Sequence, residues 1–209
     1  MAISTYSELK ASIADFLNRS DLTAVIPTFI TLAESQMNRD IRHWEMEELV
    51  SGQQSSGDKY MTKPSDWLET IRFQVITGGI STIELAGLSS ISDKRQKAND
   101  VGGIPRFYSH VRGQFELYPT PDQDIDFELM YYQKIAALSD SNTTNWLLTY
   151  APDVYLYGSL LHSAPYLKED ERVTVWGQLY AAAVVQLNLQ SERVKNSGSG
   201  IRLNIRGLG

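Results

Sequence analysis

Cysteine is missing from the 209-residue chain. Its absence excludes a disulfide scaffold, a thiolate zinc site, an iron–sulfur cluster and a cysteine nucleophile. Histidine is scarce, and His43, His110 and His162 form no metal-binding pair in sequence. No apolar run approaches the ~20 residues of a membrane span, and the first residues lack the features of a signal peptide. We therefore expect a soluble, unexported protein.

The common catalytic and cofactor-binding motifs are also missing. The chain contains no Gly-x-Ser-x-Gly elbow, no phosphate-binding Gly-x-x-x-x-Gly-Lys loop and no Gly-x-Gly-x-x-Gly fingerprint. The alternating carboxylates of residues 122–126 resemble the start of a calcium loop, but Phe127 replaces the required glycine and Gln133 the required glutamate. We expect no enzyme, no metal and no cofactor, with an unrecognised carboxylate pair of a hydrolase as the remaining enzymatic alternative.

Charge is distributed unevenly along the chain, whose formal net charge is −6. Residues 193–209 contain four basic side chains and no acidic one, which leaves −10 for the other 192 residues. The acidic body argues against a general nucleic-acid binder. The basic, glycine-rich end is the first indication of a segment with a separate task.

Both ends of the chain have helical periodicity. Thr5 and Glu8 fit a capping box, and Pro27 suits the first turn of a second helix. We place Glu34, Asn38 and Arg39 on the solvent face of that helix. The apolar positions of the two predicted helices are Tyr6, Leu9, Ile13, Phe16 and Leu17, then Ile26, Phe29, Ile30, Ala33, Met37 and Ile41.

The C-terminal helices are predicted from about 145 onward. One begins at Pro152, with Asp153 near its positive end, runs to about Ser163 and is ended by Pro165. Another ends near Val194 after an apolar stripe. The stripe comprises Val173, Trp176, Tyr180, Ala183, Val184 and Leu187.

The middle of the chain reads as short strands separated by turns. The clearest is 125–133, where apolar and polar residues alternate. We expect a polar loop at 51–57 and one or two helical turns at 88–96. The remaining strands are expected at 44–50, 60–64, 67–76 and 80–85, with a hairpin of 105–111 and 115–118.

These patterns predict an α+β fold. The N- and C-terminal segments would form a helical bundle, with an antiparallel β domain inserted between them and a flexible C-terminal arm. The expected parts are an N-terminal helical hairpin (1–43), a β domain (44–136), C-terminal helices (137–195) and the arm (196–209). In the arm, apolar and basic residues alternate over 201–206 like a strand, and a lone strand needs a partner, which we expect to be another chain.

Several stretches of this sequence resemble the adaptor proteins of tailed bacteriophages, also called head-to-tail connector or head completion proteins. The resemblance covers nearly the whole chain, and its most specific part is 145–167. The stretches that carry it are 5–9 (TYSEL), 33–39 (AESQMNR), 103–108 (GIPRFY), 115–121 (FELYPTP), 129–132 (LMYY), 145–148 (NWLL), 152–161 (PDVYLYGSLL) and 164–167 (APYL).

The resemblance implies a structural role without enzymatic activity. Such adaptors form a ring, usually of twelve subunits, under the portal protein; they extend the DNA channel and offer a surface to the tail or nozzle protein. It implies a virion protein at the head–tail interface, assembled in the host bacterial cytoplasm, with no membrane partner. Its C-terminal arm would dock on the portal through Ile201, Arg202, Leu203, Ile205 and Arg206.

The aromatic residues concentrate in the C-terminal half, and Tyr and Trp are enriched at protein interfaces. We expect Asp153, Tyr155 and Tyr157 to shape either the last helical pair or a subunit interface. The alternative function is a nucleic-acid-binding packaging accessory protein, in which the basic C-terminal tail contacts phosphates.

Overall fold

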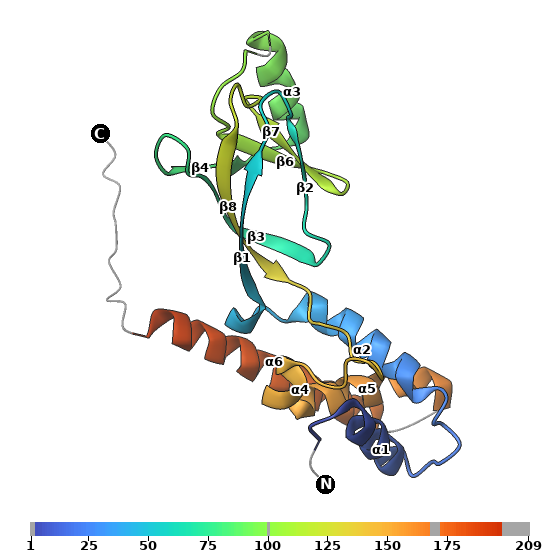
Figure 1. Cartoon of the computed structure of the whole chain (residues 1–209). Helices are drawn as coiled ribbons and strands as arrows, with labels where there is room; N and C mark the ends of the chain where they lie inside the picture. The colour runs from blue at the N-terminus through green and yellow to red at the C-terminus, as the bar shows by residue number, and fades with distance from the viewer. Residues whose placement is uncertain (1–2, 100, 168–171, 198–209) are drawn as a thin grey trace. The chain divides into compact units, whose positions relative to one another are not determined.

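The computed structural model describes residues 3–99, 101–167 and 172–197 (Figure 1). The chain forms two compact units. The first, here the helical unit, consists of Met1–Glu45 and Ile135–Gly209; the second, the β unit, is Met46–Lys134. Helices from both ends of the chain thus share one unit while the intervening strands form the other, which confirms the predicted α+β fold class.

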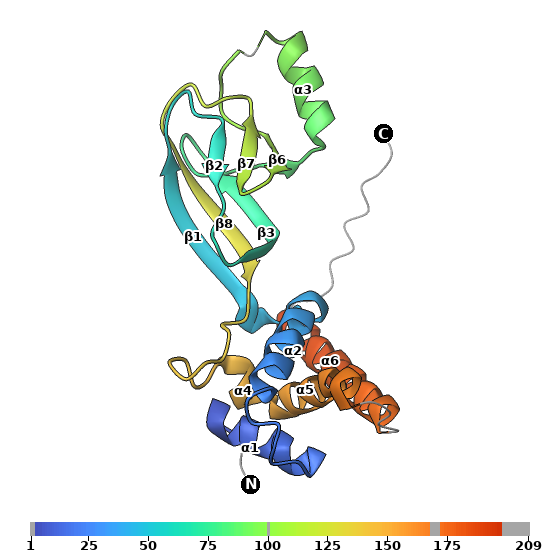
Figure 2. The ribbon, with the colours of Figure 1, turned by 90° about the vertical axis from the view of Figure 1, so that its right-hand side faces the viewer.

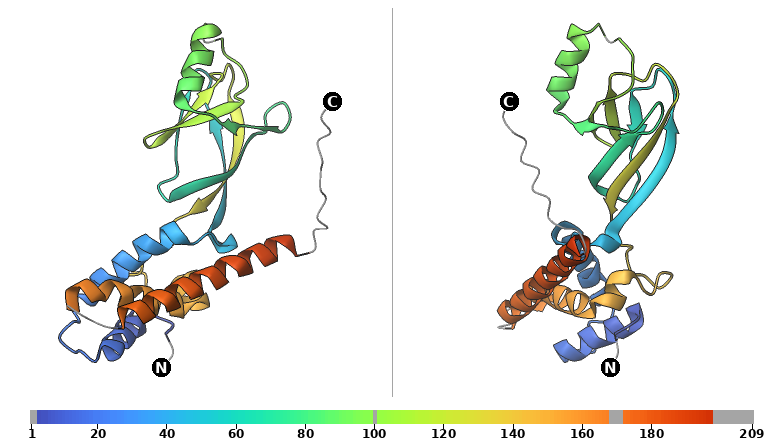
Figure 3. Two further views of the ribbon diagram at one scale, coloured as in Figure 1. Left: turned by 180° about the vertical axis from the view of Figure 1, so that it is seen from behind. Right: turned by 90° about the vertical axis from the view of Figure 1, so that its left-hand side faces the viewer.

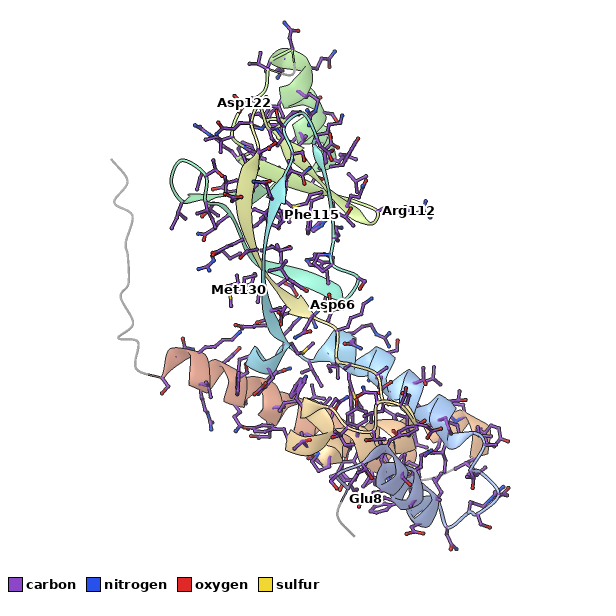
Figure 4. All side chains as sticks on the ribbon, in the orientation of Figure 1. Glu8, Asp66, Arg112, Phe115, Asp122 and Met130 are labelled. Carbon is purple, nitrogen blue, oxygen red and sulfur yellow. The ribbon has the colours of Figure 1, made fainter. Side chains whose placement is uncertain are left out.

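Helix α1 (Tyr6–Leu17) begins at the predicted capping box, in which the Glu8 amide donates to the Thr5 hydroxyl at 3.3 Å. Figure 4 labels Glu8 in this first turn. The helix ends where Asn18 adopts a left-handed conformation. Most of the predicted apolar positions are buried, but Phe16 is 49 % exposed. Phe16 lies in the last turn, where the helix ends and less of the unit covers it.

Helix α2 (Ile26–Asp40) has Pro27 in its first turn, as predicted, and buries the whole predicted apolar face. Glu34 is buried as well and does not lie on the solvent face. Its position explains this correction, because Glu34 follows Ile30 by four residues and precedes Met37 by three.

Three helices complete the helical unit: α4 (Trp146–Tyr150), α5 (Pro152–Leu167) and α6 (Val173–Asn196). Helix α5 contacts α1, α2, α4 and α6 and is therefore central. It continues through Pro165 to Leu167, beyond the predicted end. A proline this close to a helix end removes a single backbone hydrogen bond, which the last turn tolerates better than the helix interior does.

The β unit contains two four-stranded sheets, ordered β1-β8-β3-β4 and β2-β7-β6-β5. All pairs are antiparallel except β5 with β6. Figure 2 shows helix α3 (Leu88–Lys97) beside the second sheet. The strands are β1 (Glu47–Gln54), β2 (Tyr60–Thr62), β3 (Trp67–Val75), β4 (Ser81–Thr82), β5 (Glu84–Leu85), β6 (Phe107–Val111), β7 (Gln114–Tyr118) and β8 (Ile125–Gln133).

The start of the first strand differs from the prediction. Trp44–Met46 forms a 3-10 turn, and β1 extends through Gln54, so the polar loop begins later than residue 51. The polar residues of 51–54 stay extended because they pair with β8. The buried Gln54 amide donates to the Asp58 and Tyr60 carbonyls at 3.0 and 3.2 Å.

Aromatic and aliphatic side chains fill the space between the two sheets. Phe115 is fully buried there and lies 5.6 Å from Phe73, ring centre to ring centre (Figure 4). Arg112, at the tip of the β6–β7 hairpin, has the positive φ that a tight turn requires. The core comprises Met61, Phe73, Val75, Ile83, Tyr108, Phe115, Leu117, Ile125, Leu129 and Tyr131.

Candidate assembly surface of the helical unit

Helix α6 lies along the outside of the helical unit (Figure 3) and is apolar on two faces. Its inner face carries the predicted stripe, of which Trp176, Tyr180, Val184 and Leu187 are buried. Polar contacts reinforce it: the Tyr180 hydroxyl donates to Asp40 Oδ2 at 3.1 Å. This face holds α6 on the rest of the unit.

The outer face of α6 is the unexpected one. Val175, Leu179, Val185 and Leu189 are 53, 40, 54 and 42 % exposed, and exposed Ala182 lies among them. We call these five residues the outer ridge. Their spacing of three or four residues places them on one face of the helix. Isolated exposed aliphatic residues are ordinary, whereas a row of them along a helix marks an interaction surface.

A groove of about 520 Å³ lies beside the outer ridge. Residues of α4 and α5 form one wall, among them Tyr150, Asp153 and Tyr157, and Leu179 and Ala182 of the ridge lie on the other. Asp153 is exposed and Tyr157 half-buried. Two of the three residues that we expected at either the last helical pair or a subunit interface therefore line one open groove.

Tyr155, the third of these residues, points the other way and is fully buried. Its hydroxyl donates to Glu34 Oε1 at 3.2 Å and accepts from Asn145 Nδ2 at 2.6 Å. Burial and the neighbouring Glu34 carboxylate raise the pKa of Tyr155 far above its usual range. The side chain thus connects α2 and α5 within the subunit, and of the three residues only Asp153 and Tyr157 line the groove.

Glu34 is the residue that the sequence reasoning missed, although its helical spacing was a signal. Its Oε1 also accepts from the Leu138 amide at 2.7 Å. Burial raises the pKa of Glu34, and the hydrogen bonds from Leu138 and Tyr155 oppose that shift. One turn away, Asn38 Oδ1 accepts from the Ile135 amide at 2.8 Å. Together these side chains fix the segment that follows the β unit.

Two of the three histidines and one carboxylate of the segment that resembles a calcium loop make contacts within the chain. His162 bonds Gln36 at 2.9 Å, and His43 is buried against the ring of Trp146, 5.0 Å away. The Asp124 carboxylate accepts from the Ser56 amide at 2.9 Å. Among the described residues, no group of three metal-ligating side chains converges, and no helix is long and apolar enough to cross a membrane.

The predicted portal-docking residues lie outside the described part of the chain. They are Ile201, Arg202, Leu203, Ile205 and Arg206. The last described turns of α6, which lead toward them, already carry the basic residues Arg193 and Lys195.

The helical unit thus carries a row of exposed aliphatic side chains on α6 beside an open groove. A sequence model of the SU10 adaptor protein family matches residues 4–202. The chain belongs to this family of phage head–tail adaptor proteins, which confirms the resemblance seen in its sequence. None of the curated proteins compared with the chain is significantly similar to it.

Proposed function

We propose that the protein is a subunit of a ring that docks under the phage portal, extends the DNA channel and attaches the tail or nozzle. The observation that carries this proposal is the outer ridge of α6. In a subunit that acts alone, a row of half-exposed aliphatic side chains stays in contact with water at a cost in free energy. In a ring, the neighbouring subunit covers this row at every interface. Twelve subunits is the number that the resemblance implies.

The energetics of the ridge suit an assembly of many weak contacts. Covering the exposed half of one Val or Leu side chain stabilises an interface by roughly 1 kcal/mol. Four such side chains recur at each interface, together with the groove that contains Asp153 and Tyr157. A contact this weak does not hold free subunits together in solution, so a template is needed to assemble them.

The C-terminal segment supplies contact with the template. Residues 193–209 carry four positive charges. After residue 200, apolar side chains alternate with basic or polar ones. We propose that this arm docks on the portal protein and that ring formation follows docking. The rest of the chain is acidic, which lowers its affinity for DNA phosphates and lets DNA pass without being held.

Particle mass tests this function. Mass photometry is performed on the protein alone and after mixing with portal protein purified from the same phage. We expect small particles alone and a portal complex heavier by about a dozen subunits, the number implied by the resemblance. A portal that gains no mass from folded protein overturns the proposal. DNA binding that falls steeply with salt and disappears on deletion of 196–209 would then favour the packaging accessory protein.

A further inference from the structure

We infer that the outer ridge of one subunit packs against helix α1 of the next subunit. This inference rests on the proposed function, because it names the two surfaces that meet in the ring. The partner is a second copy of the same chain, and the contact is head-to-tail: one copy contributes α6 and the other α1.

Helix α1 presents a surface unlike the outer ridge. Ser7, Ala11 and Ala14 follow one another at helical spacing on its outer face, and Ser7 and Ala11 are exposed. With Lys10, Thr23 and Ile26 they line a groove of about 310 Å³. Because the side chains of Ser7, Ala11 and Ala14 are short, a helix can approach the α1 backbone closely along this row.

The two surfaces are complementary in shape. The outer ridge offers the larger side chains of Val175, Leu179, Val185 and Leu189, whereas the side chains at positions 7, 11 and 14 of α1 are small. Packing the ridge of one helix into the groove of another is the usual way in which helices associate.

The positions of the two surfaces favour a ring over a dimer. Helix α5 contacts both α1 and α6, and Figure 2 shows it between them. The inner faces of α1 and α6 are both buried, so their outer faces point away from this central helix. A subunit with two different complementary surfaces joins its copies head-to-tail, and such a chain closes when the rotation between copies divides the circle.

The absence of cysteine makes a direct test simple. Ala11 and Ala182 are exposed alanines at the middle of the two surfaces, so cysteine at either position leaves the fold intact. The double variant carrying A11C and A182C is treated with a short bis-maleimide crosslinker, both at high protein concentration and on the portal. We expect a ladder of crosslinked subunits on denaturing gels from the double variant only.

Control variants separate this arrangement from others. The A11C variant combined with A137C, another exposed alanine of the helical unit, is expected to give no ladder. The A182C single variant is expected to stay uncrosslinked, because α6 does not meet α6. Dimers from A182C alone, or added mass on the portal without a ladder from the double variant, overturn the inference. If the portal gains mass but the double variant gives no ladder, the proposed adaptor function stands, because that function is tested by the mass bound to the portal.

Discussion

Glu34 of α2 and Tyr155 of α5 share a buried hydrogen bond, with 3.2 Å between the carboxylate Oε1 and the phenolic oxygen. The same Glu34 oxygen accepts the backbone amide of Leu138, so one carboxylate joins two helices and the segment that returns from the β unit. The Asn145 side-chain amide donates a hydrogen bond to the Tyr155 hydroxyl and another, of 2.7 Å, to the Ala136 carbonyl. Stability of the helical unit should therefore depend on a few polar atoms in its core.

Replacing Tyr155 with Phe should lower the free energy of unfolding by roughly 1–3 kcal/mol, because buried Glu34 and half-buried Asn145 each lose a partner. Urea denaturation followed by circular dichroism measures the change. Tyr157→Phe is the matched control, since this half-buried side chain lies on the open groove. Equal losses from both variants would contradict a structural role specific to Tyr155.

The pH dependence of stability should report on Glu34. Burial raises its pKa above the ordinary value of 4.5, so the folded chain binds the proton more tightly than the unfolded chain. The stability that Glu34 contributes is therefore complete below the unfolded pKa and is lost as the pH rises through the folded pKa. Glu34→Gln removes this titration.

Unfolding free energies of the wild type and Glu34→Gln, compared from pH 4 to pH 8, check this prediction. The wild-type value minus the variant value should fall as the pH rises above about 4.5 and then level off. A difference that grows with pH would mean that the hydrogen bonds from Leu138 and Tyr155 outweigh burial.

Leu179→Asp should prevent assembly without unfolding the subunit. The side chain is 40 % exposed, so the change to the monomer should stay within about 0.5 kcal/mol. An aspartate placed in each ring interface should cost several kcal/mol of association free energy, because a charge is buried without a partner. Mass photometry on the portal measures the loss. Ala181→Asp, exposed on the same helix but beside the outer ridge, should assemble normally.

Leu203→Asp should abolish docking on the portal while leaving the folded subunit unchanged. The residue belongs to the alternating segment of the proposed arm, where a charge replaces one of the apolar side chains. Pull-down with the portal measures docking, and thermal unfolding checks the fold. Asn204→Asp adds the same charge at a neighbouring polar position and is the matched control. Normal docking by Leu203→Asp would show that the portal contacts another surface.

Local patterns in the sequence were sufficient wherever neighbouring residues determine the structure. The capping box at Thr5, the alternation of 125–133 and the hairpin across Arg112 all appear as predicted. Burial of Glu34 was missed because charge suggested solvent, whereas its partners come from residues more than 100 positions away. Pairing with β8 likewise extends β1 through polar residues that resemble a loop.

The candidate site was harder to predict than the fold. Sequence periodicity identified the inner stripe of α6. The outer ridge is harder to recognise in the sequence, because the polar residues Gln178 and Gln186 share its face. Whether an aliphatic residue on a helix is covered depends on which other helices lie near it. Asp153 and Tyr157 were selected for their types and position, and only the packing of α5 on α6 places them on one groove.

The first and last strands of the β unit, β1 and β8, pair antiparallel, with Glu47 opposite Tyr132. The two ends of this insertion are therefore neighbours, and the chain leaves and re-enters the helical unit within a short distance. An insertion with adjacent ends places little constraint on its host. The β unit can be lengthened, shortened or exchanged for another module as one insertion, while the helices that carry the outer ridge keep their packing.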